Sequence, residues 1–157
     1  MNKEFLIKTE VKPSTIENGG NARYFMENVK KGTVIRKQKV DSESLQVFNN
    51  EKDLEKVDIT ILKHYAYPVP EDCLFHSNKV FLNNPFMYCN HSNDPNIKDE
   101  YTDTHKYTIT TRDVVEGEEM FINYGDFKKV EWFENYLEKN NVIGVRQFAK
   151  MYETKKN

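Results

Sequence analysis

The stretch that decides the fold is Asn90-His91-Ser92-Asn93-Asp94-Pro95-Asn96. We interpret it as a loop, because Asn, Asp and Ser side chains bond to nearby backbone groups and proline fixes φ. The preceding Phe86-Met87-Tyr88-Cys89 is apolar and would anchor it. An anchored loop rich in amide and imidazole groups can present polar atoms to a ligand. An ordinary turn is the alternative interpretation of the segment taken alone.

A second segment, Gly117-Glu118-Glu119-Met120-Phe121-Ile122-Asn123-Tyr124-Gly125-Asp126, follows some twenty residues later. It predicts a turn and then a strand over residues 119–124 that breaks at Gly125. A tyrosine at the end of a strand can direct its hydroxyl into a pocket while its ring stays packed. A purely structural tyrosine is the alternative for Tyr124.

Two further segments precede these. Residues 19–25 read Gly-Gly-Asn-Ala-Arg-Tyr-Phe, and small residues there would let the backbone approach a ligand closely, although a plain turn explains them as well. Residues 29–35 read Val-Lys-Lys-Gly-Thr-Val-Ile and predict strand, turn and strand, with no chemistry of their own.

The composition predicts one folded domain without a membrane span. The chain has 157 residues, of which 13% are aromatic, and disordered chains are poor in aromatics. Its net charge of −2 gives no bulk attraction to nucleic acid or to a membrane surface. We find no apolar run long enough to span a bilayer and no cleavable signal at the start. We therefore expect an intracellular protein whose two cysteines are reduced thiols.

The rest of the pattern predicts many short strands and few helices. Strands are expected at residues 5–11, 33–35, 80–82 and 107–111, one helix at residues 53–65, and two helical stretches after Asp126. Pro68 and Pro70 would end the first helix. Strands and helices do not alternate regularly, which excludes a doubly wound parallel sheet but selects no particular β-rich fold.

In order and spacing, the four segments resemble the SET-domain family of protein lysine methyltransferases. That family carries a Gly-x-Gly turn, an Ile-x-x-Gly-x-x-Ile-like segment, Asn-His-Ser-x-x-Pro-Asn, and Glu-Leu-x-x-Asp-Tyr-Gly. The third motif is present at every specified position, and the fourth departs by Met120 for Leu and Asn123 for Asp. The first motif is degenerate, with Ala22 for the second glycine and Arg23 for an apolar residue. The resemblance covers roughly residues 5–126.

The resemblance implies a mainly β fold with some α, made of small curved sheets. It also implies a C-terminal pseudoknot, in which the Asn-His-Ser segment threads beneath the C-terminal strand. The SET domain would span residues 1–127, and a C-terminal helical flank would span residues 128–157. The family activity is methyl transfer from S-adenosylmethionine to a lysine of another protein, and a histone tail is one candidate substrate.

The resemblance also implies roles for particular residues. Tyr124 would be the catalytic tyrosine. The cofactor would be bound by Gly20, Asn21, Ala22, Tyr88, Asn90, His91 and Tyr124. No cysteine cluster follows Tyr124, so we favour Trp132 to close the cleft, with packing in a helix as an equal alternative. Candidate walls of the substrate channel are Tyr65, Tyr67, Tyr101 and Tyr107, and Ile122 stands where some family members place a residue that governs the number of methyls added.

Other interpretations stay open. Cys73 with His76 and Cys89 with His91 could suggest zinc, but the second pair is too tightly spaced, so we predict no metal. Acidic residues exceed basic ones between residues 90 and 120, which would suit a basic tail in a substrate groove or be a solvated face. We expect the protein to act on a protein partner and to bind neither nucleic acid directly nor a membrane. We expect it in the nucleus or the cytoplasm. The rival interpretation is an inactive SET-fold binding module, because the first and fourth motifs are imperfect.

Overall fold

The fold is described from a computed structural model, which defines the backbone of residues 5–156 and the side chains as far as Tyr152. The outer ends of the two domain ranges predicted above, residues 1–4 and 157, lie outside the described part. The elements are β1 (Thr9–Pro13), β2 (Asn21–Phe25), β3 (Val34–Lys39), β4 (Leu45–Phe48), α1 (Glu51–Leu54), α2 (Ile59–Tyr65), β5 (Ala66–Pro68), β6 (Val80–Asn83), β7 (Asn90–His91), β8 (Ile97–Tyr101), β9 (His105–Thr110), β10 (Phe121–Ile122), the 3-10 turn η1 (Tyr124–Asp126), α3 (Glu131–Lys139) and α4 (Val145–Lys156).

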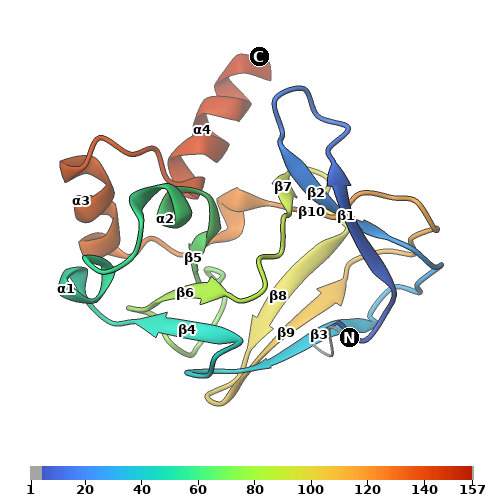
Figure 1. Cartoon of the computed structure of the whole chain (residues 1–157), viewed down its shortest axis with the longest axis horizontal. Helices are drawn as coiled ribbons and strands as arrows, with labels where there is room; N and C mark the ends of the chain where they lie inside the picture. The colour runs from blue at the N-terminus through green and yellow to red at the C-terminus, as the bar shows by residue number, and fades with distance from the viewer. Residues whose placement is uncertain (1–4, 157) are drawn as a thin grey trace.

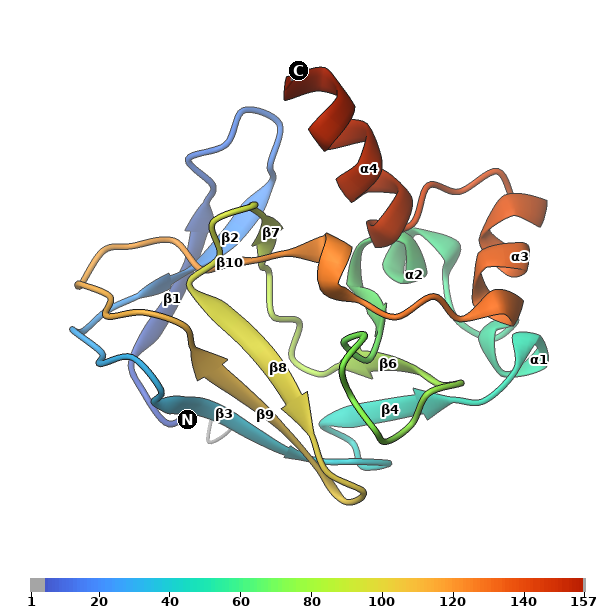
Figure 2. The same ribbon diagram turned by 180° about the vertical axis from the view of Figure 1, so that it is seen from behind.

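Small sheets form most of the structure (Figure 1). Two are three-stranded and antiparallel, in the orders β3-β9-β8 and β4-β6-β5, and β1 pairs with β2 as an antiparallel hairpin. Helices α1, α2 and α3 lie together beside the β4-β6-β5 sheet, while α4 and the tip of the β1–β2 hairpin rise on one side of the molecule (Figures 1 and 2). The prediction of a mainly β fold of small sheets with a few helices is confirmed.

A short parallel pair joins the two most informative sequence segments. Strand β7 pairs with β10, so that Asn90 lies opposite Phe121 and His91 lies opposite Ile122. The side chain of Asn96 reinforces this pairing, because its Nδ2 donates to the carbonyl of Glu119 at 2.8 Å and its Oδ1 accepts from the Phe121 amide at 2.8 Å. The mid-chain loop is therefore fixed against the segment that leads to Tyr124. Threading of one segment beneath the other stays a prediction.

The predicted helix over residues 53–65 is wrong as a single element. The structure has α1 and α2 separated by a turn, and Asp58 begins the second helix by accepting the Thr60 amide at 2.8 Å. An aspartate at this position satisfies an amide that has no partner inside the helix, which favours a new helix start there. The apolar spacing of the segment is helical on both sides of the break, so the sequence pattern alone does not reveal the turn between the two helices.

Two predicted strands are shorter than expected. The first begins only at Thr9, because Phe5 forms an isolated bridge with Arg36 and its ring packs against the guanidinium groups of Arg23 and Arg36 at 4.1 Å and 4.6 Å. The strand expected over residues 119–124 is reduced to Phe121–Ile122. Tyr124 consequently begins a 3-10 turn rather than ending a strand. No strand was predicted at β2, β4, β5, β7 or β8, and β7 lies at the start of the segment that was interpreted as a loop.

The two helices expected after Asp126 are confirmed as α3 and α4. Buried Phe133 and Leu137 attach α3 to the core that also contains Leu54 and Leu62. Buried Val145 and Ala149 bring α4 against η1. Within residues 5–156, no helix is long and apolar enough to cross a membrane.

Candidate active site

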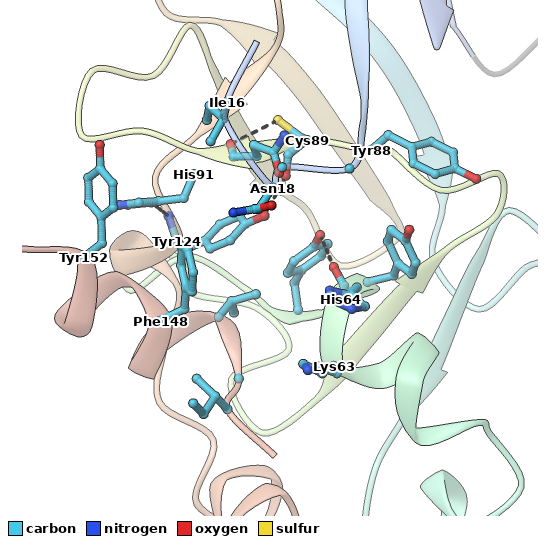
Figure 3. Close-up of a pocket in the computed structure, with 18 of the residues that line it drawn as sticks. Ile16, Asn18, Lys63, His64, Tyr88, Cys89, His91, Tyr124, Phe148 and Tyr152 are labelled. Atoms are coloured by element: carbon cyan, nitrogen blue, oxygen red, sulfur yellow. Dashed lines mark hydrogen bonds between the residues drawn. The ribbon is translucent and has the colours of Figure 1, made fainter. Parts of the chain in front are cut away.

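A cavity of about 670 Å³ lies where five segments of the chain meet (Figure 3). It is bounded by the β1–β2 loop, the end of α2 with β5, the segment that enters β7, η1, and the α3–α4 loop with α4. Its lining residues are Ile16, Glu17, Asn18, Gly19, Gly20, Asn21, Lys63, His64, Tyr65, Tyr67, Tyr88, Cys89, Asn90, His91, Tyr124, Ile143, Gly144, Val145, Phe148, Met151 and Tyr152.

Tyr124 is held at two points by the segment that contains the Asn-His-Ser motif. Its hydroxyl donates to the carbonyl oxygen of Cys89 at 2.7 Å, and its main-chain N–H donates to Nδ1 of His91 at 3.0 Å. Because a main-chain N–H can only donate, Nδ1 of His91 must be unprotonated. Burial raises the pKa of the Tyr124 hydroxyl, and the Cys89 thiol and the Tyr65 hydroxyl add to this rise. Tyr124 is therefore a neutral phenol at physiological pH.

Further tyrosine rings line the same cavity as Tyr124. Tyr67 lies 6.2 Å from Tyr124 between ring centroids and donates its own hydroxyl to the His64 carbonyl at 2.8 Å. Tyr65 stacks on Phe86 at 4.0 Å, and Tyr88 meets Tyr65 edge-on at 5.7 Å. Burial raises the pKa of Tyr67 well above its usual value, so this hydroxyl also stays protonated. One side of the cavity thus carries several aromatic rings, with Lys63 and His64 beside them.

Helix α4 supplies the opposite wall. Phe148 lies 5.9 Å from the ring of Tyr124, and Tyr152 lies 5.0 Å from the ring of His91 (Figure 3). Phe148 and Met151 keep 46% and 40% of their surface exposed at the cavity, whereas Ala149 is buried on the other face. Helix α4 therefore has two apolar faces. The face with Ala149 packs on the domain, and the face with Phe148 and Met151 borders the cavity.

The structure brings most of the predicted site residues together. The predicted cofactor residues that line the cavity are Gly20, Asn21, Tyr88, Asn90, His91 and Tyr124, and the predicted channel residues that do so are Tyr65 and Tyr67. The lining residues that the sequence did not single out come mainly from the β1–β2 loop, the end of α2, and the α3–α4 loop with α4. For α4 a signal was present in the helical spacing of Phe148, Met151 and Tyr152, but the sequence analysis named no cofactor residue in this helix.

Five predicted residues lie elsewhere. Trp132 donates its Nε1 to the Asn78 carbonyl at 2.9 Å and packs against the core around α3, so the packing alternative describes it. Ala22 and Ile122 are buried in strands, and neither lines the cavity. The remaining two are Tyr101, packed on Phe81, and Tyr107, on β9 beside Lys37.

Three residues that depart from the family motifs, Ala22, Arg23 and Asn123, fit their local structure. Gly20 has a φ of +65°, whereas Ala22 lies in extended β2, where alanine is unstrained. The Arg23 guanidinium donates to the carbonyls of Met87 and Phe86 at 3.2 Å and 3.1 Å, which holds the segment that carries Tyr88.

Asn123 is accommodated in a similar way. Its Oδ1 accepts the Gly125 amide at 2.8 Å and caps η1, a bond that needs no carboxylate. None of the four departures from the motifs, at Ala22, Arg23, Met120 and Asn123, lines the cavity.

The positions of the possible metal ligands bear on the prediction that the protein holds no metal. Among the described residues, no group of three or more His, Cys, Asp or Glu side chains could hold a metal ion. Burial raises the pKa of the Cys89 thiol well above its usual value, so this sulfur stays protonated.

A profile of the SET domain matches residues 24–125, well over half of the chain. The chain belongs to the SET-domain family. No curated protein sequence matches it significantly. Among solved structures, it resembles a candidate histone methyltransferase of Plasmodium falciparum with 18% identity and a TM-score of 0.52, covering 76% of this chain and 94% of the other.

Chains of Polycomb Repressive Complex 2 are similar to this SET domain as well. A Chaetomium thermophilum complex bound to an inhibitor matches with 15% identity and a TM-score of 0.58, over 84% of this chain and 17% of the other. A ctPRC2 structure bound to S-adenosylmethionine matches with 17% identity and a TM-score of 0.58, over 86% and 17% of the two chains. The SET chain thus corresponds to a small part of those proteins, and the likeness establishes the fold.

Proposed function

We propose that this protein is an S-adenosylmethionine-dependent protein-lysine N-methyltransferase. The observation that carries the proposal is the meeting of Tyr124 with Asn90 and His91 at one cavity. These residues belong to the two family motifs that are specific as a pair, and they come from separate parts of the chain. Their convergence supports a transferase more directly than either motif does alone.

The lining residues suit the two ends of the proposed cofactor. Gly20 and Asn21 line the cavity, and Asn90 binds Ser14 and Glu119 through Nδ2, which leaves Oδ1 as its acceptor for an ammonium group. Phe148 and Tyr152 offer ring faces and edges on which an adenine can pack. We assign to α4 the role that the sequence assigned to Trp132. When bound, S-adenosylmethionine supplies a methyl group on a positively charged sulfur.

The target lysine must reach this cavity without its proton. Its ordinary pKa is near ~10.4, and an apolar aromatic environment disfavours the ammonium form. Tyr65 and Tyr67 are the channel residues that line the cavity, and their rings can attract an ammonium group before it loses its proton. Alignment of the amine with the methyl group is then the main contribution of the channel to the rate.

Tyr124 is proposed as the catalytic tyrosine because its hydroxyl is directed by the main chain. Its O–H bond points at the Cys89 carbonyl, so Oη can accept C–H···O contacts from the polarised methyl group on its other side. The raised pKa keeps this hydroxyl neutral, so its geometry is maintained over the pH range in which lysine loses its proton.

A basic protein segment, of which a histone tail is one example, is the proposed substrate class. The carboxylates of Asp72 and Glu71 lie close enough to Asp126 to raise its pKa, after the larger effect of burial. Asp126 follows Tyr124 by two residues in η1, so carboxylates lie next to the proposed catalytic residue, and Glu71 among them also pairs with Arg146 at 3.8 Å. Such a charge favours approach of a basic partner. We also propose an intracellular location, in the nucleus or cytoplasm.

The test is a methyl-transfer assay with labelled S-adenosylmethionine, the five core and linker histones, and a cell lysate, followed by mass spectrometry of labelled bands. We expect label on lysine side chains. Calorimetric titration with S-adenosylhomocysteine separates the alternatives, because an inactive binding module that lost the cofactor would give no heat. Absence of both label and cofactor binding would overturn the proposal.

A further inference from the structure

Glu119 is a buried carboxylate that receives hydrogen bonds from the β1–β2 loop and from β7, and a longer one of 3.4 Å from the Tyr24 hydroxyl of β2. Only 5% of its surface is exposed. The Thr15 amide and hydroxyl donate to Oε1 at 2.8 Å and 2.7 Å, and the Ser14 hydroxyl donates to Oε2 at 2.8 Å. Asn90 donates its Nδ2 to the same Oε2 at 3.2 Å. One side chain therefore joins the start of the β1–β2 loop to strand β7.

Both of these segments form the cavity. The loop continues from Thr15 into residues 16–21, all of which line it, and Asn90 lines it from β7. Ser14 strengthens the connection, because its hydroxyl oxygen accepts from the Asn90 Nδ2 at 3.0 Å and from the Ile16 amide at 3.0 Å. The loop residues from Ile16 to Asn18 are exposed, so their position depends on what holds the loop at its base.

We infer that Glu119 is a positioning residue that fixes the β1–β2 loop against Asn90 and thereby sets the affinity for the cofactor, an inference that rests on the proposed function. Glu119 does not line the cavity, so it acts through the loop and not by contact.

The arrangement requires a carboxylate. The Thr15 amide and the Asn90 Nδ2 can only donate, and they donate to different oxygens of Glu119. Glutamine has one oxygen, so in Glu119→Gln one of these two donors would face an NH₂ group. An unmet donor in a buried site costs the bond and its desolvation, so the loop would lose part of its anchor.

The neighbouring glycine gives an independent constraint. A Cβ at Gly19 would lie 2.9 Å from the Ser14 hydroxyl oxygen and 3.0 Å from the Ile16 carbonyl oxygen. The loop therefore has no room for a side chain there unless Ser14 moves away from Glu119. Gly19→Ala should weaken the same connection from the other side.

The experiment compares E119Q, T15V and the unmodified protein. For each, calorimetry gives the dissociation constant for S-adenosylhomocysteine, and steady-state kinetics give KM for S-adenosylmethionine and kcat separately. We expect E119Q to weaken cofactor binding about tenfold and T15V about threefold, with kcat at saturating cofactor within about twofold. E118Q is the matched control, because Glu118 binds Arg112 and the Val115 amide and does not line the cavity. Thr15 is exposed, so T15V tests the inference even if E119Q does not fold.

Amide hydrogen exchange provides the readout that a merely structural role would not give. Exchange should accelerate in residues 14–20 of E119Q and T15V and stay unchanged in the β3-β9-β8 sheet. Equal cofactor affinity in T15V, E119Q and the unmodified protein would overturn the inference alone. Failure of the unmodified protein to bind cofactor would instead overturn the proposed function and the inference together.

Discussion

The main-chain N–H of Tyr124 donates to Nδ1 of His91 at 3.0 Å, and this bond connects the two sequence motifs at the point where the chain turns into η1. His91 is buried, and its ring lies 5.2 Å from that of Tyr124. The imidazole therefore orients the proposed catalytic tyrosine through its backbone. This role for His91 is additional to any contact with the cofactor.

Two substitutions of His91 separate this role from simple packing. In Asn the Oδ1 stands at the position of Nδ1 and can accept the Tyr124 amide, whereas the Oε1 of Gln corresponds to Nε2. We expect kcat at saturating cofactor to be about tenfold lower in H91Q than in H91N, because an unmet buried amide costs about 1–3 kcal/mol. Steady-state kinetics at fixed pH measure this. Equal rates in the two variants would show that the bond to Nδ1 does not matter.

Acid should weaken the contribution of Glu119 to folding. Burial alone would raise the pKa of this carboxyl, but hydrogen bonds from Thr15, Ser14 and Asn90 outweigh burial and hold the pKa below its usual value. A lowered pKa means that the stabilisation is present above the unfolded-state pKa, near ~4.3, and is lost as the pH falls through the folded-state pKa.

Thermal unfolding between neutral pH and about pH 3 checks this for the unmodified protein and E119Q. The difference in Tm between the two proteins should shrink as the pH falls. A difference that stays constant with pH would contradict the assignment of an ionised Glu119 in the folded state.

Helix α4, and not Trp132, should control cofactor affinity from the C-terminal side. Phe148 is half exposed at the cavity, so F148A should leave the fold intact and weaken binding of S-adenosylhomocysteine by about tenfold through lost aromatic contact. The comparison variant is W132F, which removes the bond to Asn78 but lies outside the cavity. Calorimetry should give W132F the affinity of the unmodified protein, and the reverse order of effects would refute the role of α4.

The residues that the sequence located correctly are those whose motif order is specific. Asn90, His91 and Tyr124 stand in two motifs that this family carries together, and the parallel pairing of β7 with β10 unites them. Gly20 was predicted as a small residue that lets the main chain approach a ligand closely, and the structure gives it a left-handed φ of +65°.

The remaining contacts depend on tertiary packing that no local pattern contains. Phe148 and Trp132 are both aromatic residues on C-terminal helices, and their helical spacing does not reveal which one faces the cavity. The same applies to Glu119, whose motif position predicted no partner, although its carboxylate meets Thr15 more than one hundred residues away in the sequence. The break between α1 and α2 was missed because apolar spacing continues across Asp58.

Substitution of Tyr124 by phenylalanine tests the central claim most directly. The variant loses only the hydroxyl that donates to Cys89 and would accept contacts from the methyl group, so the cavity should keep its shape. Tyr107→Phe is the matched control, because Tyr107 lies on β9 outside the cavity.

With labelled S-adenosylmethionine and saturating protein substrate, Y124F should transfer methyl groups at least about a hundredfold more slowly than the unmodified protein. The affinity of Y124F for S-adenosylhomocysteine should stay within about threefold of that of the unmodified protein. Y107F should match the unmodified protein in both measurements. Turnover in Y124F close to that of the unmodified protein would contradict the account.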